Sequence, residues 1–244
     1  MYATRIRPGG RTGGRWLALD RPGGAYTGWA VVVGPNGAGK TALLDNVARG
    51  AVDVVEGEPR VLAHYRDDRR LAAGDRVDSL VKDISLRAAG EHGVVLIDEV
   101  EAHLHLSVQQ QIGFTLTDRF PTVQFLVTTH SPYVCQAADV VVRLDPQRGA
   151  YTADEALLDR VIYGSGDDAA LSDLFALESP YSPPSQALRE ELVTLEMAVL
   201  DGTASAAQVE RYHAIQGLLT SSPTARSEEV KARLRRRAAR ERRA

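Results

Sequence analysis

Cysteine is nearly absent from this chain of 244 residues, and long hydrophobic runs are missing. The single cysteine, Cys135, excludes an intrachain disulfide and argues against a zinc site made of thiolates, as expected in a reducing compartment. The longest aliphatic runs have four or five residues, whereas a helix that spans a membrane needs roughly 20. The first residues contain no apolar segment of a secretory signal. We therefore expect a cytoplasmic protein without a membrane partner.

The net charge is small, but it is unevenly distributed. The formal net charge is −3, from 29 basic and 32 acidic residues. Residues 1–30 hold five arginines and one acid, residues 231–244 hold eight basic residues and one acid, and residues 31–230 hold 16 basic and 30 acidic residues. Basic ends are typical of chains that touch nucleic acid or an acidic partner. An arginine-rich end that packs on the chain's own acidic body explains the pattern equally well.

Continuous apolar stretches alternate with amphipathic ones over the first part of the chain. Such strands are typical of a parallel sheet covered on both faces, because none of their residues meets water. We therefore predict an α/β fold with a sheet of mostly parallel strands and helices on both faces. The predicted strands are 29–33, 94–97, 123–128 and 140–144, with further candidates at 60–65 and 16–19, and the predicted helices are 41–49, 77–89 and 108–120.

Beyond residue 149 no further strand is predicted, and an all-helical region follows. Thr152 and Glu155 match a capping box that opens a helix to about residue 163, and a second short helix is predicted over 168–177. We therefore divide the chain into a first domain, 1–149, and a helical C-terminal region, 150–244, that ends in the basic tail.

Two apolar stripes at helical spacing follow a proline-rich connector and predict a helical hairpin of about 35 residues. Ser205 and Gln208 are expected to cap its second helix. The hairpin is either a lid on the sheet domain or a docking surface for a partner.

Residues 34–41 match the pattern G-x-x-x-x-G-K-[ST] in full, between a predicted strand and a predicted helix, which is the context that this phosphate-binding motif requires. Its glycines let backbone N–H groups converge on phosphate oxygens, and the helix N-terminus adds the positive end of its dipole. Lys40 is expected to reach the β- and γ-phosphates of ATP, and the Thr41 hydroxyl to ligate Mg²⁺. The predicted nucleotide-binding residues are Gly34, Asn36, Gly37, Ala38, Gly39, Lys40, Thr41 and Ala42.

Two carboxylates, Asp98 and Glu99, directly follow the apolar strand 94–97. The C-terminal edge of a parallel sheet is where ligands bind in open α/β folds, and a carboxylate buried without a partner is costly. We therefore expect Asp98 to hold Mg²⁺ through water. Glu99 is expected to orient and deprotonate the attacking water.

Histidines follow the ends of two predicted strands, 94–97 and 123–128. His130, at the tip of strand 123–128, is placed to reach a γ-phosphate. Glu101, His103 and His105 alternate so that all three could face one side of an extended chain and bind a metal. We favour the alternative that these three residues belong to the turn from the acidic strand into the next helix.

Together these segments resemble the ABC-type ATPase head of the SMC, RecF-like and OLD-like group of AAA ATPases. The pattern of that group is GxNGxGKT, then four apolar residues and DEPExHLHP, then a strand that ends in THSP. The match covers roughly residues 28–145, with Val100 and Leu106 where prolines are usual. The resemblance implies that Glu99 is the catalytic base, that His130 is the switch histidine, and that Lys40 completes the catalytic set. It also implies at least a dimer in the ATP state, since the site of this family is composite.

Two departures from the family pattern bear on turnover. Residues 71–76 occupy the place of the LSGGE-type signature, with Ala72 where the family has the serine that contacts the γ-phosphate of the opposite protomer. The backbone N–H of Gly74 is kept as a nucleotide contact. Loss of the serine hydroxyl as a hydrogen-bond donor could slow turnover by ~10²–10³-fold. No glutamine precedes Gln109, so the family's glutamine between the two motifs is missing, and His64, Tyr65 or Asp67 would have to replace it.

The helical C-terminal region lacks the Asp-x-Asp strand pattern of the nuclease domain in OLD proteins, so a nuclease would be a separate chain. A compact ATPase with a helical tail resembles the ATPase components of bacterial antiphage systems of the Septu and retron kinds. The predicted function is therefore a Mg²⁺-dependent ATPase that dimerises on ATP and regulates a DNA-acting partner, such as a nuclease, in defence or repair. The alternatives are a nucleotide sensor with little turnover, favoured by Ala72, and an ABC transporter subunit, disfavoured by the short segment between the motifs.

Overall fold

The computed structural model describes residues 5–7, 17–19, 28–50, 53–54, 60–66, 76–88, 90–175, 177, 179 and 181–219. The chain divides into two compact units, Met1–Glu178 and Ser179–Ala244. The expected boundary after residue 149 does not coincide with this division. The basic tail, 231–244, and most of the basic N-terminal segment lie outside the described residues.

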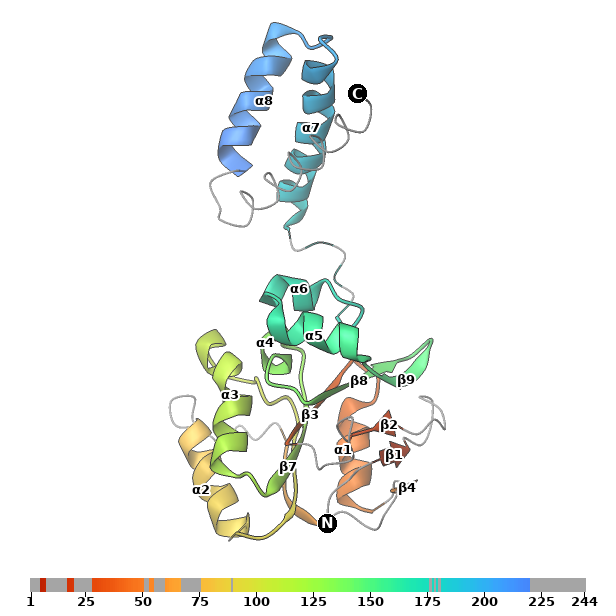
Figure 1. The fold of residues 1–244 in the computed structure, drawn as a ribbon, viewed down its shortest axis with the longest axis vertical. Coiled ribbons are helices and arrows are strands. Elements are labelled where there is room, and N and C mark those ends of the chain that lie inside the picture. Colours follow the sequence, from red (N-terminus) through yellow and green to blue (C-terminus); the bar gives the residue numbers. More distant parts are fainter. Residues whose placement is uncertain are drawn as a thin grey trace. The chain divides into compact units, whose positions relative to one another are not determined.

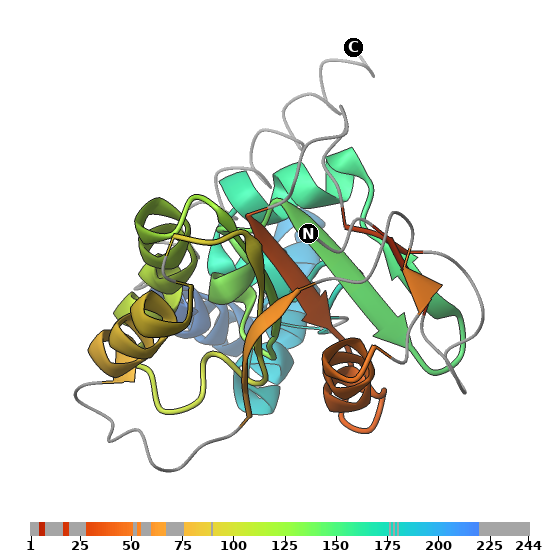
Figure 2. The ribbon, with the colours of Figure 1, turned by 90° about the horizontal axis from the view of Figure 1, so that it is seen from below.

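The first unit is built on a six-stranded sheet with the order β5-β6-β7-β3-β8-β9. All neighbours are parallel except β8 and β9. Seen from below, the strands lie side by side with helices on both faces (Figure 2), which confirms the predicted fold class. The strands are β5 (Val61–Tyr65), β6 (Gly93–Ile97), β7 (Val123–Thr128), β3 (Trp29–Val33), β8 (Val140–Asp145) and β9 (Gly149–Thr152).

Strand β9 corrects the expectation that no strand follows residue 149. Asp145 accepts backbone N–H groups from Gln147 and Arg148 through its Oδ1, at 2.8 and 3.0 Å, which closes a turn. Gly149, with φ 79°, then reverses the chain so that β9 pairs antiparallel with β8. The residues of the turn are the signal for this hairpin. The apolar pattern, on which the strand prediction relied, does not reveal it.

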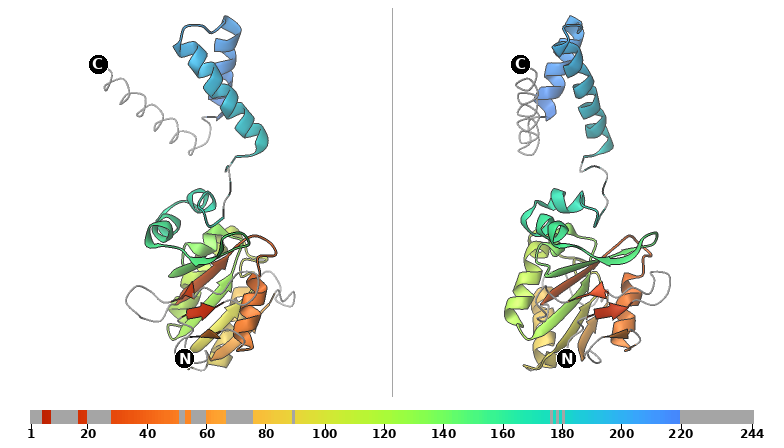
Figure 3. Two further views of the ribbon diagram at one scale, coloured as in Figure 1. Left: turned by 90° about the vertical axis from the view of Figure 1, so that its right-hand side faces the viewer. Right: turned by 45° about the vertical axis from the view of Figure 1, so that its right-hand side comes forward.

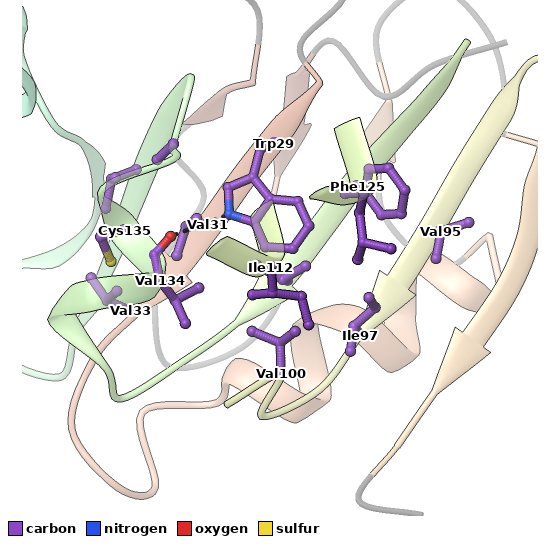
Figure 4. Close-up of a cluster of buried hydrophobic side chains, with 14 of the residues drawn as sticks. Trp29, Val31, Val33, Val95, Ile97, Val100, Ile112, Phe125, Val134 and Cys135 are labelled. Atoms are coloured by element: carbon purple, nitrogen blue, oxygen red, sulfur yellow. Dashed lines mark hydrogen bonds between the residues drawn. The ribbon is translucent and has the colours of Figure 1, made fainter. Parts of the chain in front are cut away.

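The strand side chains alternate between two cores, one on each face of the sheet. Along β3, Trp29, Val31 and Val33 enter the first core, whereas Ala30 and Val32 enter the second. Trp29 packs against Phe125 of β7 with the ring centroids 5.5 Å apart (Figure 4). Every residue of β3, β6 and β7 is buried, and only Gln124 and Thr128 of β7 are polar.

Helices cover the two faces unequally (Figure 1). The second core takes its helical contribution from α1 (Lys40–Ala48), and a small antiparallel sheet adds Ile6 and Leu17. That sheet has the order β2-β1-β4, from β1 (Arg5–Arg7), β2 (Leu17–Ala18) and β4 (Asp53–Val54). The helices that supply the first core are α2 (Arg76–Ala88), α3 (Leu106–Arg119), α4 (Pro132–Cys135), α5 (Glu155–Tyr163) and α6 (Gly166–Ala170).

Two helix starts differ from their predictions. Asp154, not Thr152, caps α5, because Thr152 ends β9 and the Asp154 Oδ1 accepts the Leu157 N–H at 2.9 Å. Helix α6 begins at Gly166 behind a capping box of Ser165 and Asp168. The helix expected over 168–177 is therefore shorter and starts earlier.

The second unit contains the predicted helical hairpin of α7 (Pro183–Leu200) and α8 (Ala206–Leu219), which lie side by side (Figure 3). Leu195 of α7 and Ile215 of α8 are buried. Ser205 and Gln208 exchange the predicted capping hydrogen bonds, at 2.8 and 3.3 Å. No helix within the described part of the chain is long and apolar enough to cross a bilayer.

Candidate nucleotide site

The phosphate-loop residues lie between β3 and α1, as the motif requires. A Cβ on Gly34 would lie 2.4 Å from the Leu144 carbonyl oxygen of β8, so only glycine fits against that strand. Gly39, with φ 96°, is the N-cap of α1 and turns the chain into the helix in a conformation that other residues rarely adopt. Asn36, Gly37, Gly39, Thr41 and Ala42 are exposed, and Ala38 is buried.

Lys40 folds back over its own loop. Its Nζ donates to the carbonyl oxygens of Gly34, at 2.9 Å, and Pro35, at 3.3 Å, and the residue is only 7% exposed. Desolvation lowers the pKa of Lys40, and the negative charges of Glu99, Asp98 and Glu101 oppose that shift, in this order of strength. Lys40 is therefore within electrostatic reach of the two acidic residues that follow β6 and of Glu101 in the turn after them.

The carboxylates Asp98 and Glu99 follow β6 directly. Asp98 is 6% exposed, and its Oδ1 accepts a hydrogen bond from the Thr128 hydroxyl of the neighbouring strand β7. The same hydroxyl oxygen accepts the Glu99 backbone N–H at 2.8 Å. Glu99 itself has φ 47°, a left-handed conformation that is uncommon outside glycine. Thr128 therefore fixes both acidic residues.

A Thr128→Val substitution should destabilise the fold measurably. It keeps the shape of the side chain but leaves the buried Asp98 carboxylate and the Glu99 N–H without a partner. We expect the free energy of unfolding to fall by about 1–3 kcal/mol. Thermal denaturation followed by circular dichroism measures the change.

Thr117→Val is the matched control, because the hydroxyl of Thr117 bonds only within its own helix, to Gly113 and Phe114. An equal loss of stability in the two variants would contradict the bridging role of Thr128.

The segment after β7 carries His130, which is exposed. Its backbone N–H donates to Glu101 Oε1 at 2.6 Å, and the Thr129 hydroxyl donates to Glu101 Oε2 at 2.6 Å. The Ser131 hydroxyl donates to Gln109 Oε1 at 2.7 Å. The structure thus joins the two histidine- and acid-bearing segments that the sequence identified separately.

These contacts leave the alternative metal site without support. Both carboxylate oxygens of Glu101 accept hydrogen bonds, and the His105 Nδ1 accepts the Ser107 N–H at 3.3 Å as the N-cap of α3. His103 is exposed, with φ 62°. Among the described residues no three His, Cys, Asp or Glu side chains come together to hold a metal ion.

Of the candidates to replace the missing glutamine, His64 has the surroundings that best suit a functional residue. It stands near the end of β5, where the Tyr65 carbonyl accepts the Asp98 N–H at 2.8 Å. The His64 Nε2 is buried without a hydrogen-bond partner, 3.8 Å from Asp45 Oδ1. Desolvation is the main cause that lowers the pKa of His64.

Tyr65 is engaged elsewhere, since its hydroxyl donates to Asp83 Oδ2 at 2.6 Å and burial raises its pKa. Asp67 and the signature-like residues 71–75, including Ala72 and Gly74, lie outside the described residues, and α2 begins at Arg76.

Sequence reasoning missed three roles within this site. Thr128 and Glu101 belong to the recognised motifs, but nothing in their spacing shows that Thr128 bonds to Asp98 or that Glu101 bonds to residues 129 and 130. Gln109 lies on α3, and its Nε2 also donates to the Leu104 carbonyl at 2.9 Å. No pattern in the sequence marked it.

Comparisons with known proteins agree with the motifs. Residues 79–136 match the family described as "AAA domain, putative AbiEii toxin, Type IV TA system". The chain is 40% identical over 96 residues to the retron Ec83 probable ATPase of Escherichia coli, covering 39% of this chain and 16% of that protein. It is 26% identical over 119 residues to Septu protein PtuA of Bacillus thuringiensis, covering 44% of this chain and 30% of that protein.

A solved nucleotide-free ATP-binding cassette from an ABC transporter superposes with a TM-score of 0.38 at 13% identity, over 62% of this chain and 88% of that one, a likeness too weak to carry an argument. The chain spans less than a third of the length of either of these two curated relatives. The family match and the relatives agree with the assignment that the three motifs predicted: residues 79–136 resemble an AAA domain, and the chain is similar in sequence to a retron probable ATPase and to Septu protein PtuA.

Proposed function

We propose that this chain binds ATP with Mg²⁺, hydrolyses it, dimerises in the ATP state and regulates a DNA-acting partner in antiphage defence. The observation that carries the proposal is that the phosphate loop with Lys40 follows β3 while the carboxylates Asp98 and Glu99 follow β6, so this cation and these anions lie at the carboxyl edge of one parallel sheet. A phosphate chain with its metal suits such a mixture of one cation and several anions.

The loop supplies the binding step. Backbone N–H groups of residues 36–41 and the N-terminus of α1 are suited to the phosphate oxygens. Lys40 would exchange its contacts with the Gly34 and Pro35 carbonyls for the β- and γ-phosphates. The loop is thus held together by the group that later binds the ligand.

The donors near the loop suit Mg²⁺. Thr41 offers an exposed hydroxyl, and Asp98 a buried carboxylate with only one oxygen in a hydrogen bond to Thr128. These are the hard oxygen ligands that Mg²⁺ prefers, and the ion would neutralise charge on the phosphate oxygens.

For hydrolysis, Glu99 takes the role of general base toward the attacking water. The hydrogen bond from its backbone N–H to Thr128 fixes the position from which the carboxylate extends at the edge of the sheet. His130, exposed at the tip of the neighbouring strand β7, would contact the γ-phosphate. This set therefore offers two contributions to catalysis. The carboxylate removes a proton from the water, and the imidazole donates a hydrogen bond to the charge that develops on the phosphate.

Partners follow from the resemblance and from charge. The similarity to retron and Septu proteins supports a place in a defence system with a separate nuclease or other effector. The basic ends support contact with nucleic acid. A composite site with a second copy of this chain supplies the signature residues 71–76 from the opposite protomer.

A nucleotide sensor with little turnover is the second candidate. Ala72 replaces the signature serine, and no glutamine precedes Gln109. Both losses affect groups that act in turnover more than in binding.

Steady-state ATP hydrolysis by the purified chain, with and without duplex DNA, tests the proposal. We expect Mg²⁺-dependent turnover that duplex DNA increases. Turnover of about 1 s⁻¹ or more would exclude the sensor, because it is an ordinary enzymatic rate. Tight ATP binding without turnover would contradict hydrolysis and favour the sensor. A rate that duplex DNA leaves unchanged would contradict the DNA-acting partner.

A further inference from the structure

Glu101 is bonded to the segment that carries His130, although the two lie 29 residues apart. One oxygen of its carboxylate accepts the His130 backbone N–H and the other accepts the Thr129 hydroxyl, each at 2.6 Å. Hydrogen bonds to a charged acceptor are roughly twice as strong as neutral ones. A single side chain therefore fixes two consecutive residues immediately before the turn into α4.

The segment is secured from its other side as well. Thr129 is fully buried, and its hydroxyl oxygen also accepts the Ser131 N–H at 2.9 Å. The Ser131 hydroxyl reaches Gln109 on α3, which itself is bonded to the Leu104 carbonyl. Because these groups are largely removed from water, solvent cannot replace a lost partner without cost.

Glu101 also belongs to the turn that contains the proposed base. The Ala102 N–H donates to the Glu99 carbonyl at 2.9 Å, and the Val100 N–H donates to the Thr128 carbonyl at 3.1 Å. The backbone of Glu99 and the backbone of His130 are therefore parts of one hydrogen-bonded assembly with Glu101 between them.

We propose that Glu101 is a positioning residue that sets the place of the His130 imidazole relative to the terminal phosphate. This inference rests on the proposed hydrolysis of ATP. Glu101 touches neither nucleotide nor water in this role, and it acts through the backbone of residue 130. Since His130 is exposed, its imidazole depends on that backbone anchor for its position.

Glutamine should keep only part of the anchor. A Glu101→Gln side chain can accept the His130 N–H through its carbonyl oxygen. Its amide group then faces the Thr129 hydroxyl and can only donate to the hydroxyl oxygen, so a weaker neutral hydrogen bond replaces the one to a charged acceptor. An intermediate effect is therefore expected from glutamine, and the full effect from Glu101→Ala.

The test is a double-mutant cycle in ATP hydrolysis with Glu101→Ala and His130→Ala. We expect Glu101→Ala alone to lower kcat by about 10- to 100-fold, since misplacement of a reacting group by about 1 Å has that effect. The KM for ATP should stay within about twofold, because the residue does not bind the ground state. In the His130→Ala background, Glu101→Ala should change kcat by less than about twofold.

Three controls separate positioning from folding. Thermal denaturation of each variant must show a folded chain, and Glu101→Gln, with its conserved shape, should lower kcat by about 3- to 10-fold. Ser131→Ala removes the bond to Gln109 but keeps both bonds of Glu101, and it should have a smaller effect than Glu101→Ala. Equal factors for Glu101→Ala in the wild-type and His130→Ala backgrounds would overturn the proposal.

Amide hydrogen exchange provides a readout without turnover. Loss of the Glu101 anchor should accelerate exchange in residues 128–131 by about 10-fold or more, while His130→Ala leaves it unchanged. If the wild-type chain binds ATP but does not hydrolyse it, the proposed function fails, and the exchange experiment still decides whether Glu101 holds this segment. Unchanged exchange in Glu101→Ala would overturn the anchor itself.

Discussion

Glu99→Gln should lower the kcat for ATP hydrolysis by about 10³-fold while ATP stays bound, because general-base catalysis contributes typically 10²–10⁴-fold. The substitution replaces a proton acceptor by an amide of the same size. The backbone bond of residue 99 to Thr128 is unaffected, so the geometry of the edge is retained. Single-turnover hydrolysis measures the rate, and equilibrium titration with ATP measures the affinity.

Glu155→Gln is the matched control, because Glu155 is an exposed acid on α5, away from the loop and the acidic edge in the sequence, and should leave kcat unchanged. Turnover at the wild-type rate in Glu99→Gln would show that another group activates the water.

Retained ATP without hydrolysis should also trap the ATP-bound dimer, so sedimentation of Glu99→Gln with ATP should report twice the mass of the chain. A monomer under these conditions would contradict the proposed dimerisation.

The interior of the fold could be predicted from the sequence because burial and pattern coincide there. In β3 and β6 every residue is buried, and a run such as Val94 to Ile97 has no other favourable place. The glycine loop could be recognised from its local pattern, although Gly34 is required by the distant Leu144 of β8 and Gly39 by its positive φ. The pattern that reveals these elements is local, even where the contacts that require it are not.

What the sequence did not show depends on contacts between distant residues or on turn chemistry. The bond of Thr128 to Asp98 joins residues 30 apart, and its existence follows from the parallel pairing of β6 with β7. The strand β9 depends on the Asp145 turn, which contains no apolar period. Glu101 matched a metal pattern by alternation, yet the left-handed residue His103 breaks the extended geometry that alternation assumes.

Lys40→Ala should abolish the function one step earlier, at binding. The side chain ties the loop together through the carbonyls of Gly34 and Pro35, and in our proposal it then binds the phosphates. Its loss also removes the positive charge that offsets the nearby negative charges of Glu99 and Asp98, so the edge of the sheet becomes less favourable for a polyanion. We expect the Kd for ATP to rise by about 10²-fold or more, which corresponds to roughly 2.7 kcal/mol.

Calorimetric titration with ATP and Mg²⁺ measures the change in Kd, and Lys82→Ala, a lysine exposed on α2, is the matched control. The two central variants then differ in kind, since Glu99→Gln keeps ATP and loses turnover, whereas Lys40→Ala loses both. ATP binding by Lys40→Ala within about threefold of the wild type would place the phosphates elsewhere and would contradict the site, because the charge-assisted bonds of an ammonium to phosphate exceed that difference. The pair of variants thus separates the cation that holds the nucleotide from the carboxylate that acts on it.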